Sequence, residues 1–364
     1  MSSQQDAYTW FSDITGLPEY DWLEERHHSI QQAPNGDLLV QNMHTKKIYE
    51  AGHFSVHSVE ELTPPTTIAT NPPPFELHIR TEERGKPFVD VAYLQAHAQE
   101  KTLFQVASNF NCAEVAHPYV EPDNGSFVSN LAIDSTQGPA ASASGGVSAI
   151  TRIHAPFYDP NTPSDTWGQT HSRQIELLGH PLVAPHFPVI NGKLWFHGTE
   201  PTEFSPENIL PHIRIGLHRR VRPYFGYRTP PYMEKIENPP SIDQVFVAAL
   251  NRRAPLPYPE HLASKTNLLL DAAYQGTYLS ALFCNNPLLM LTLIGGGSFA
   301  NPPHLIAQAI AKAHKNYAGL TPLQKVILPL YPLGGIVQRE DFTALLFDAF
   351  QAKGIDSLLS IKHV

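Results

Sequence analysis

Residues 291–299, with the sequence LTLIGGGSF, have a pattern suited to binding phosphate. Residues 291–294 predict a short buried strand, three glycines at 295–297 follow directly, and residues 304–313 predict a helix after an Asn-Pro-Pro stop. A glycine turn between a strand and a helix presents unhindered backbone N–H groups to phosphate oxygens. The spacing matches neither the dinucleotide fingerprint nor the P-loop. A tight turn that binds nothing is an equally good interpretation of this run alone.

Composition argues against several classes of function. The chain has 364 residues, of which 42% are hydrophobic, so it can bury a large core. A net charge of -9 without a long basic patch argues against a nucleic-acid partner. The longest apolar stretch, 278–294, is broken by Asn285-Asn286-Pro287, which argues against a membrane partner.

Cysteine and histidine usage predicts neither a disulfide nor a metal site. Cys112 and Cys284 have apolar neighbours and are expected to be core residues of a protein in a reducing compartment. The 19 histidines are scattered and show no zinc-binding spacing on a predicted helix. The N-terminus lacks the features of a signal peptide. We therefore expect a cytoplasmic protein, with export into a host cell by a signal-peptide-independent route left open.

The elements of the chain alternate in a way typical of α/β proteins. Residues 1–80 are expected to be an N-terminal extension packed on the core, with a hairpin over 38–49, and residues 81–364 the main domain with a proline-rich, loop-rich insertion around 155–240. Within the main domain the pattern predicts strands at 103–107, 244–250, 289–294 and 326–330, and helices at 268–283, 305–314 and 342–350. This order predicts a mainly parallel sheet, in which ligands bind beyond the carboxyl ends of the strands.

Several segments together resemble one family of proteins. The segments are 103–111 (LFQVASNFN), 136–140 (TQGPA), 271–274 (DAAY) and 291–301 (LTLIGGGSFAN). They resemble, in the same order, a divergent macrodomain family related to poly(ADP-ribose) glycohydrolase-like folds. The resemblance implies a macrodomain-like three-layer α/β/α fold with a mixed, mainly parallel sheet.

The resemblance also implies a function and a site. It implies that the chain binds ADP-ribose and hydrolyses the bond between ADP-ribose and a modified protein side chain, with arginine as the expected acceptor. No cofactor and no metal are implied, and the implied partner is an ADP-ribosylated protein, with ubiquitin or another small acceptor considered. The implied ligand-binding residues are Phe110, Asn111, Gln137, Gly138, Gly145, Gly146, Gly295, Gly296, Gly297, Ser298 and Phe299.

The sequence departs from the family pattern at positions that bear on catalysis. Gln275 stands where the family has a glutamate after Ala-Ala-Tyr, and Ser135 replaces an arginine beside Asp134. If the lost glutamate transfers a proton, hydrolysis would fail while binding survived. A non-catalytic ADP-ribose reader is therefore the alternative to a hydrolase, and a scaffold that binds no nucleotide is the least favoured hypothesis.

Hydrolysis of such a bond needs a group that activates water beside an oxocarbenium-like anomeric carbon. The catalytic candidates are Asp271, Asp134 and Asn111. Asp271 is the one charge in an apolar helical run, although it could instead lie on the solvent face of the helix. Asp134 could be an N-cap or turn residue, and Asn111 a strand-end turn residue.

Two further groups of residues have open roles. Gln169, Arg173 and Gln174 resemble a family pattern and are expected on a helix surface or in support of the site. A basic cluster is either a solvated face or a site for an acidic substrate or for the adenosine side of a ligand; it consists of Arg214, Arg219, Arg220 and Arg222.

Overall fold

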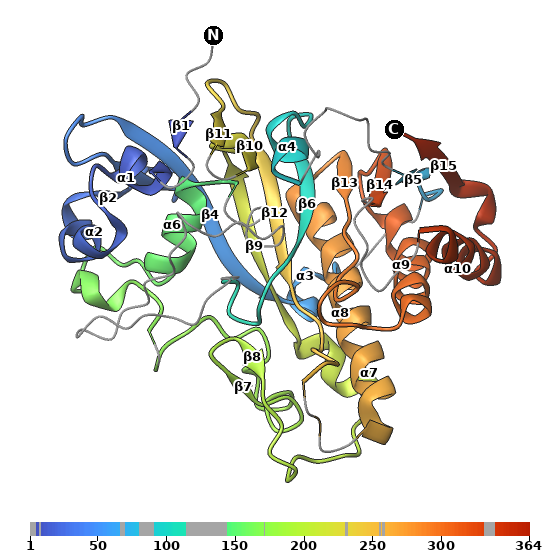
Figure 1. Cartoon of the computed structure of the whole chain (residues 1–364). Helices are drawn as coiled ribbons and strands as arrows, with labels where there is room; N and C mark the ends of the chain where they lie inside the picture. Colours follow the sequence, from blue (N-terminus) through green and yellow to red (C-terminus); the bar gives the residue numbers. More distant parts are fainter. Residues whose placement is uncertain are drawn as a thin grey trace.

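The computed structural model describes most of the chain (Figure 1). The described residues are 5–6, 9–65, 70–79, 91–113, 144–170, 172–229, 232–254, 256, 259–330 and 339–364. Three of the predicted site residues, Asp134, Gln137 and Gly138, lie outside them. Among the described residues, no helix is long and apolar enough to cross a membrane.

A ten-stranded sheet forms the centre of the molecule, in the order β15-β5-β14-β13-β6-β12-β9-β4-β3-β2. From β15 to β12 neighbouring strands are parallel, and from β12 to β2 they are antiparallel. The bounds are β2 Ile30–Gln32, β3 Leu38–Gln41, β4 Ile48–Ser58, β5 Phe75–Ile79, β6 Thr102–Ala107, β9 Arg214–Val221, β12 Ile242–Val247, β13 Leu288–Met290, β14 Lys325–Leu330 and β15 Leu359–His363. The predicted α/β class with a mixed, mainly parallel sheet is confirmed.

Smaller strands lie outside this sheet. β1 (Gln5–Asp6), β10 (Phe225–Thr229) and β11 (Tyr232–Lys235) form a three-stranded sheet. β7 (Val189–Ile190) and β8 (Lys193–Leu194), each two residues long, form a hairpin in the insertion.

Helices cover both faces of the sheet. On one face lie α8 (Leu262–Cys284), α9 (Pro303–Tyr317) and α10 (Arg339–Ala352), with the short α3 (Val59–Leu62). In Figure 1, α6 (Val147–His154), α1 (Trp10–Thr15) and α2 (Glu19–Glu25) gather beside β4, whereas α9 and α10 lie toward β15. The described residues also form two further short helices, α4 (Val91–Ala96) and α7 (Pro206–Ile209).

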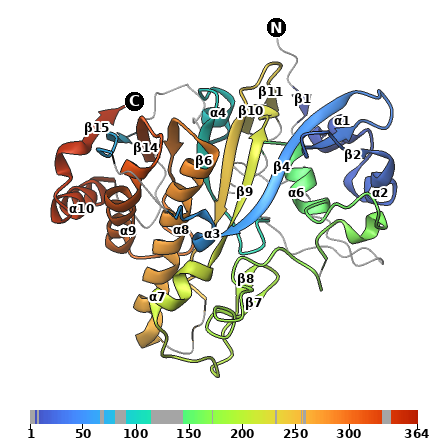
Figure 2. The same ribbon diagram turned by 180° about the vertical axis from the view of Figure 1, so that it is seen from behind.

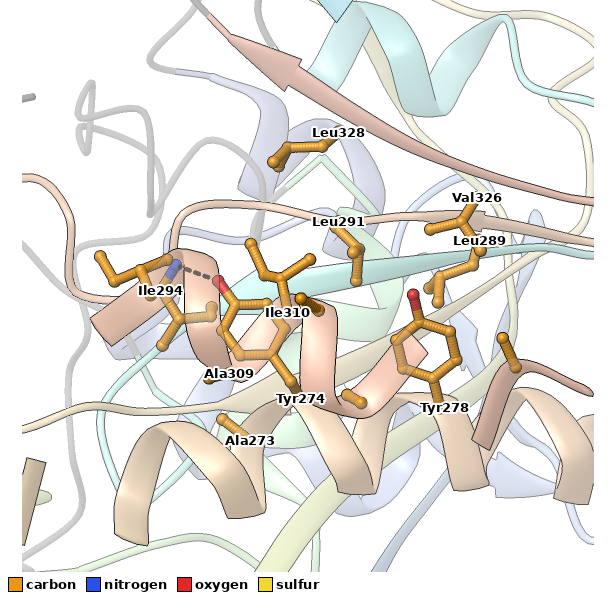
Figure 3. Close-up of a cluster of buried hydrophobic side chains, with 14 of the residues drawn as sticks. Ala273, Tyr274, Tyr278, Leu289, Leu291, Ile294, Ala309, Ile310, Val326 and Leu328 are labelled. Carbon is orange, nitrogen blue, oxygen red and sulfur yellow. Dashed lines mark hydrogen bonds between the residues drawn. The ribbon is translucent and has the colours of Figure 1, made fainter. Parts of the chain in front are cut away.

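The largest hydrophobic core lies between the parallel strands and the α8–α10 layer. Tyr274 and Tyr278 project from α8 toward Leu289 of β13 and Ile310 of α9 (Figure 3), and all four side chains are buried. The first five residues of β6 are buried without alternation, because helices or loops cover both faces of this strand. The core therefore holds β6 and β13 rigidly between the layers.

The observed elements confirm one expectation from the sequence and differ from others. The 38–49 hairpin is confirmed as β3 and β4. The helix predicted at 342–350 corresponds to α10, and it is followed by a further strand, β15, which pairs with β5. Strands from residues 1–80 are part of the main sheet, with β5 inserted between β14 and β15. A single sheet therefore includes strands from both sides of residue 80.

Glu76 of β5 is expected to make stability depend on acid pH. Burial alone would raise its pKa, but hydrogen bonds from Lys362, His78 and Lys325 outweigh burial and lower the pKa to about 2. The stabilisation is complete above the ordinary value of 4.5 and is lost as the pH falls toward 2. Urea unfolding at pH 3 to 7 should show Glu76→Gln to be about 1–3 kcal/mol less stable than wild type at pH 7. As the pH falls, the variant should lose less stability than wild type, because it lacks the carboxylate that becomes protonated. Glu24→Gln, at an exposed position on α2, should match wild type, and equal acid sensitivity of the two variants would contradict the assignment.

Candidate functional site

The glycine loop after β13 is anchored to the helix layer and to β6. The strand ends at Met290, earlier than expected, and the buried Tyr274 hydroxyl donates to Thr292 O at 2.8 Å and accepts from Ile294 N at 3.2 Å (Figure 3). Gln105 of β6 accepts a hydrogen bond from Thr292 N at 3.1 Å. These side-chain contacts replace the ladder bonds that a longer strand would have made, and so fix where the turn begins.

The far end of the same loop is tied to the segment that follows β12. Asn301 is fully buried, and its Nδ2 donates to Leu250 O at 2.9 Å and to Gly295 O at 3.1 Å. The Arg252 amide donates to Phe299 O at 2.9 Å. Because β6 lies between β13 and β12, the loop must span the carboxyl end of β6.

The middle of the loop leaves backbone donors unused. Gly297 and Ser298 are exposed, and a Cβ on Gly297 would meet no atom within 4 Å. Among the described residues, nothing accepts a hydrogen bond from the amides of Gly297, Ser298 or Phe299. The Phe299 ring is half-buried and packs against the α8–α9 core. An anchored turn with open space and free N–H groups can accept the oxygens of a phosphate.

Asn111 lies at the carboxyl end of β6, beneath the insertion. Its side chain is fully buried: Nδ2 donates to Gln174 Oε1 at 3.0 Å, and Oδ1 accepts from Ala113 N at 3.1 Å. Gln174 in turn donates to Asn191 Oδ1 at 2.9 Å, and Phe110 N donates to Gly192 O at 2.8 Å. The β7–β8 hairpin therefore covers both predicted residues of this loop.

Local sequence explains why the hairpin can approach so closely. Asn191 and Gly192 both have positive φ, as the two central residues of a tight hairpin turn require. A Cβ on Gly192 would lie 2.4 Å from Asn111 Cγ, so this contact requires glycine. The Asn-Gly pair at 191–192 is a signal that sequence reasoning had missed.

Gln169 supports the Asn111 loop from below. It is buried, its Nε2 donates to Asn111 O at 3.2 Å, and its Oε1 accepts from Ile175 N at 3.1 Å. Arg152 of α6 is also buried, donates to Cys112 O at 3.0 Å and lies over the Phe246 ring. Burial lowers the pKa of Arg152 to about 10, which leaves it charged at neutral pH. Gln169 and Gln174 thus act as supports of this loop, from a non-helical segment rather than from a helix.

Asp271 lies in a groove of about 590 Å³ on the outer side of the helix layer. Its Oδ2 is 2.5 Å from Lys312 Nζ, and its side chain is 21% exposed. The groove is within the size range of small-molecule sites. Its lining comes from three helices and consists of Asn267, Asp271, His304, Leu305, Gln308, Ala309, Lys312, Leu345, Asp348, Ala349, Ala352 and Lys353. Asp271 is one turn before Tyr274 on α8, and His304 lies in the first turn of α9, shortly after the glycine loop in the sequence.

Gly145 and Gly146 lie near the amino end of β12, whereas the glycine loop lies beyond its carboxyl end. A Cβ on Gly145 would be 2.8 Å from Val221 Cγ1, and Val221 pairs with Ile242 at the start of β12. The glycine loop instead contacts Ala249, beyond the end of β12. The strand between them is about 16 Å long at ~3.3 Å per residue. The structure therefore brings Phe110, Asn111 and residues 295–299 to one edge of the sheet, but it does not bring Gly145 and Gly146 there.

Lys265 fastens the insertion to the start of α8. Its buried Nζ donates to His186 O at 2.8 Å and lies 4.7, 5.1 and 5.5 Å from the ring centroids of Phe187, Phe196 and Phe204. Burial lowers the pKa of Lys265 to about 8, despite the opposing charge of Glu200. The aromatic rings partly replace the hydration that the ammonium loses.

No metal site is evident in the described part of the chain, which contains no group of three or more His, Cys, Asp or Glu side chains able to hold an ion.

Comparison with known proteins finds likeness in structure only. No family model matches the sequence, and no curated protein matches it. Structural neighbours are bacterial poly(ADP-ribose) glycohydrolases. The enzyme from Thermomonospora curvata is 13% identical with a TM-score of 0.48, over 94% of this chain and 99% of that one. The Deinococcus radiodurans enzyme in complex with ADP-ribose is 10% identical with a TM-score of 0.38, over 76% and 85%. At these values the likeness says nothing about activity.

Gly295 and Gly297 should respond differently to substitution by alanine. Gly295 has φ +73°, and its Cβ would lie 2.2 Å from Asn301 Nδ2, whereas Gly297 has open space. Thermal and urea unfolding should show Gly295→Ala to be less stable by about 1–3 kcal/mol. Gly297→Ala should remain within about 0.5 kcal/mol of wild type. Equal losses in both variants would contradict the described course of the loop.

Replacing Lys265 should change how stability depends on alkaline pH. Its pKa of about 8 in the folded protein lies below the ordinary 10.5, so the unfolded chain holds more protons between these values and stability rises with pH across that window. Lys265→Met should abolish this rise, and at pH 7 it should be as stable as wild type or about 1 kcal/mol more stable, because no charge is buried. Lys193→Met, at an exposed position of β8, is the control for denaturation at pH 7 to 10.5. If Lys265→Met but not Lys193→Met were less stable than wild type at pH 7, the prediction would be wrong, and the cation–π contacts would outweigh the cost of burying the charge.

Proposed function

We propose that this chain binds ADP-ribose at the carboxyl edge of the parallel strands, with the diphosphate on residues 295–299. The observation that carries the proposal is that the amides of Gly297, Ser298 and Phe299 have no hydrogen-bond acceptor in the described part of the chain, in a turn whose two ends are anchored. Fixed N–H groups need no reorganisation on binding, so they favour an anion more than a flexible loop would. The resemblance of the sequence to the divergent macrodomain family supports this choice of anion.

We further propose hydrolysis of an N-glycosidic bond between ADP-ribose and an acceptor arginine. Asp271 would take a proton from water as the water oxygen bonds to the anomeric carbon. The bond from that carbon to the guanidine nitrogen breaks, and the unmodified arginine side chain leaves and takes up the proton that Asp271 received from water. Because the guanidinium of the adduct is already protonated at neutral pH, it departs as a neutral guanidine and depends less on an acid than an alcohol would. Asp134 is the second candidate for this role and lies outside the described residues.

The acceptor would be an ADP-ribosylated protein, with ubiquitin or another small protein considered. A groove open on the helix layer can receive a side chain from such a protein without the acceptor entering the core, and Asp271 lies on its wall. The proposed reaction needs neither a cofactor nor a metal.

One observation favours a reader that binds without hydrolysis. Asp271 Oδ2 is held by Lys312 Nζ at 2.5 Å, so one oxygen of this carboxylate is already engaged by the protein rather than by a water molecule. Gln275, one turn further along α8, cannot replace it, because an amide does not take up a proton at neutral pH.

Titration calorimetry with ADP-ribose tests the binding site. Wild type should bind, and Gly297→Val should bind at least about tenfold more weakly, a difference of about 1.4 kcal/mol, because branched carbons would fill the space above the free amides. Gly297→Ala should lie between them, and all three proteins should unfold at similar temperatures. Binding that Gly297→Val leaves unchanged would contradict the assignment of this loop.

Release of free ADP-ribose from an arginine-modified protein tests hydrolysis. Asp271→Asn should slow release by about 10²–10⁴-fold while ADP-ribose affinity remains within a factor of a few. Asp21→Asn, at an exposed position on α2, is the matched control and should behave as wild type. Binding without release by wild type would identify a reader instead, and an active Asp271→Asn would remove this residue from the mechanism.

A further inference from the structure

Arg219 lies with two histidines on the α8-covered face of β4 and β9, away from the glycine loop. In the antiparallel register His53 lies opposite Arg219, and His57 opposite Ile215. Side chains alternate along strands, so His53, His57 and Arg219 share a face with Ile215, whose side chain would contact a Cβ on Gly276 of α8. Figure 2 shows β4 and β9 beside one another.

Phe283, in the last turn of α8, joins Arg219 to His57. The Arg219 Cζ atom lies 5.6 Å from the centre of the Phe283 ring, and the His57 ring centre lies 5.0 Å from it. The Phe283 side chain is 47% exposed, so the cluster is open to solvent. Stacking on an aromatic ring orients a guanidinium while leaving its in-plane N–H groups available to an acceptor.

Among the described residues Arg219 has no carboxylate partner, in contrast to the nearby Arg220 and Arg222. Arg220 forms an ion pair with Asp37, and Arg222 with Glu50 at 3.0 Å. Among the described residues no carboxylate lies within 4.0 Å of Arg219, and its buried Nε has no hydrogen-bond partner. A buried donor left without an acceptor costs about 1–3 kcal/mol, so the guanidinium of Arg219 has an unmet hydrogen bond.

The carboxylates nearest this cluster are already engaged. Asp37 is bound by Arg220, and Asp243 accepts from Arg220 N at 2.8 Å and from Asn286 Nδ2 at 2.8 Å. Glu61 caps α3 by accepting from Ser58 N at 2.7 Å. None of them is free to turn toward Arg219 without losing an existing bond.

The local field is positive although the whole chain carries a net charge of -9. The pKa of His57 is lowered overall. Burial is the largest cause, the charges of Arg219 and His53 act in the same direction, and Glu61 opposes them. The His57 ring is held in place by a 2.8 Å hydrogen bond between Nε2 and Ser55 Oγ. A negative charge placed between Arg219 and His57 would therefore meet a guanidinium that has no carboxylate partner among the described residues, and an imidazole whose protonation the negative charge would favour.

We propose that Arg219, His57 and Phe283 form a binding site for a phosphate group. The guanidinium offers paired N–H donors that match phosphate oxygens, and His57 can add a donor when protonated. This site is independent of the proposed function, because Arg219 lies near the amino end of β12 and the glycine loop contacts residues beyond its carboxyl end. The phosphate could be free or carried by a nucleotide whose base rests on the exposed Phe283 ring.

Titration of His57 by proton NMR tests the site, with His57→Gln used to assign its signal. About 10 mM inorganic phosphate, enough to fill a site with Kd near ~1 mM, is compared with chloride at equal ionic strength. In wild type, phosphate should raise the pKa of His57 by about 1, since an opposite charge favours the protonated ring. The rise should be absent in Arg219→Gln and retained in Arg222→Gln, the matched arginine that Glu50 already neutralises.

Controls separate this site from a general salt effect and from misfolding. Without phosphate, Arg219→Gln should itself raise the pKa of His57, because a nearby positive charge is removed; this confirms that the variant folds around His57. AMP in place of phosphate distinguishes the sources: an Arg219-dependent rise at lower AMP concentration assigns a nucleotide, and equal rises assign free phosphate. No rise in wild type with either ligand, or an equal rise in Arg219→Gln, would overturn the proposal.

Discussion

The hydrogen bonds of the buried Tyr274 hydroxyl are the constraint on which the carboxyl edge depends. One hydroxyl donates to Thr292 O and accepts from Ile294 N, and these two backbone groups also bond each other at 3.0 Å just after β13 ends. Burial raises the pKa of this tyrosine above its ordinary value, so the proton needed for donation is always present. Because the helix layer fixes the start of the turn, the chain has little freedom before the three glycines.

That constraint is useful only because a second anchor closes the loop. Asn301 binds Gly295 O and Leu250 O, so the loop is tied to itself and to the segment after β12. Between the anchors the amides of residues 297–299 remain without partners among the described residues. The same rigidity that strains Gly295, at φ +73°, leaves Gly297 open. Gly295 is therefore required by the course of the turn, whereas Gly297 is the glycine that the proposed ligand would approach.

The insertion changes the expected role of the loop after β6. Asn111 is bound on all sides by protein: Gln174, Ala113 and the backbone of Gly192 surround its side chain. The hairpin that covers it is fastened through Lys265, whose aromatic surroundings come from the same insertion. The residues that shape this side of the edge are thus amides and a buried lysine, while the proposed phosphate cluster around Arg219 occupies a separate part of the sheet.

The sequence by itself determined the α/β class, the β3–β4 hairpin and the glycine turn between β13 and α9, because these follow from local periodicity and from residues with special backbone freedom. The same reasoning placed Asn111 and residues 295–299 at carboxyl ends of strands. Sequence could not foresee that β5 enters between β14 and β15, or that Gly145 lies near the opposite end of β12 from Gly295.

Only the tertiary structure decided which polar groups are already satisfied. Asp271 and Lys312 are 41 residues apart, and Asn111 and Asn191 are joined through Gln174, yet no local pattern encodes either link. Arg219 and Arg220 are chemically alike and adjacent in sequence, but one faces Phe283 and the other Asp37. Successive side chains along a strand point to opposite faces of the sheet, and the groups that they contact there depend on how distant segments pack.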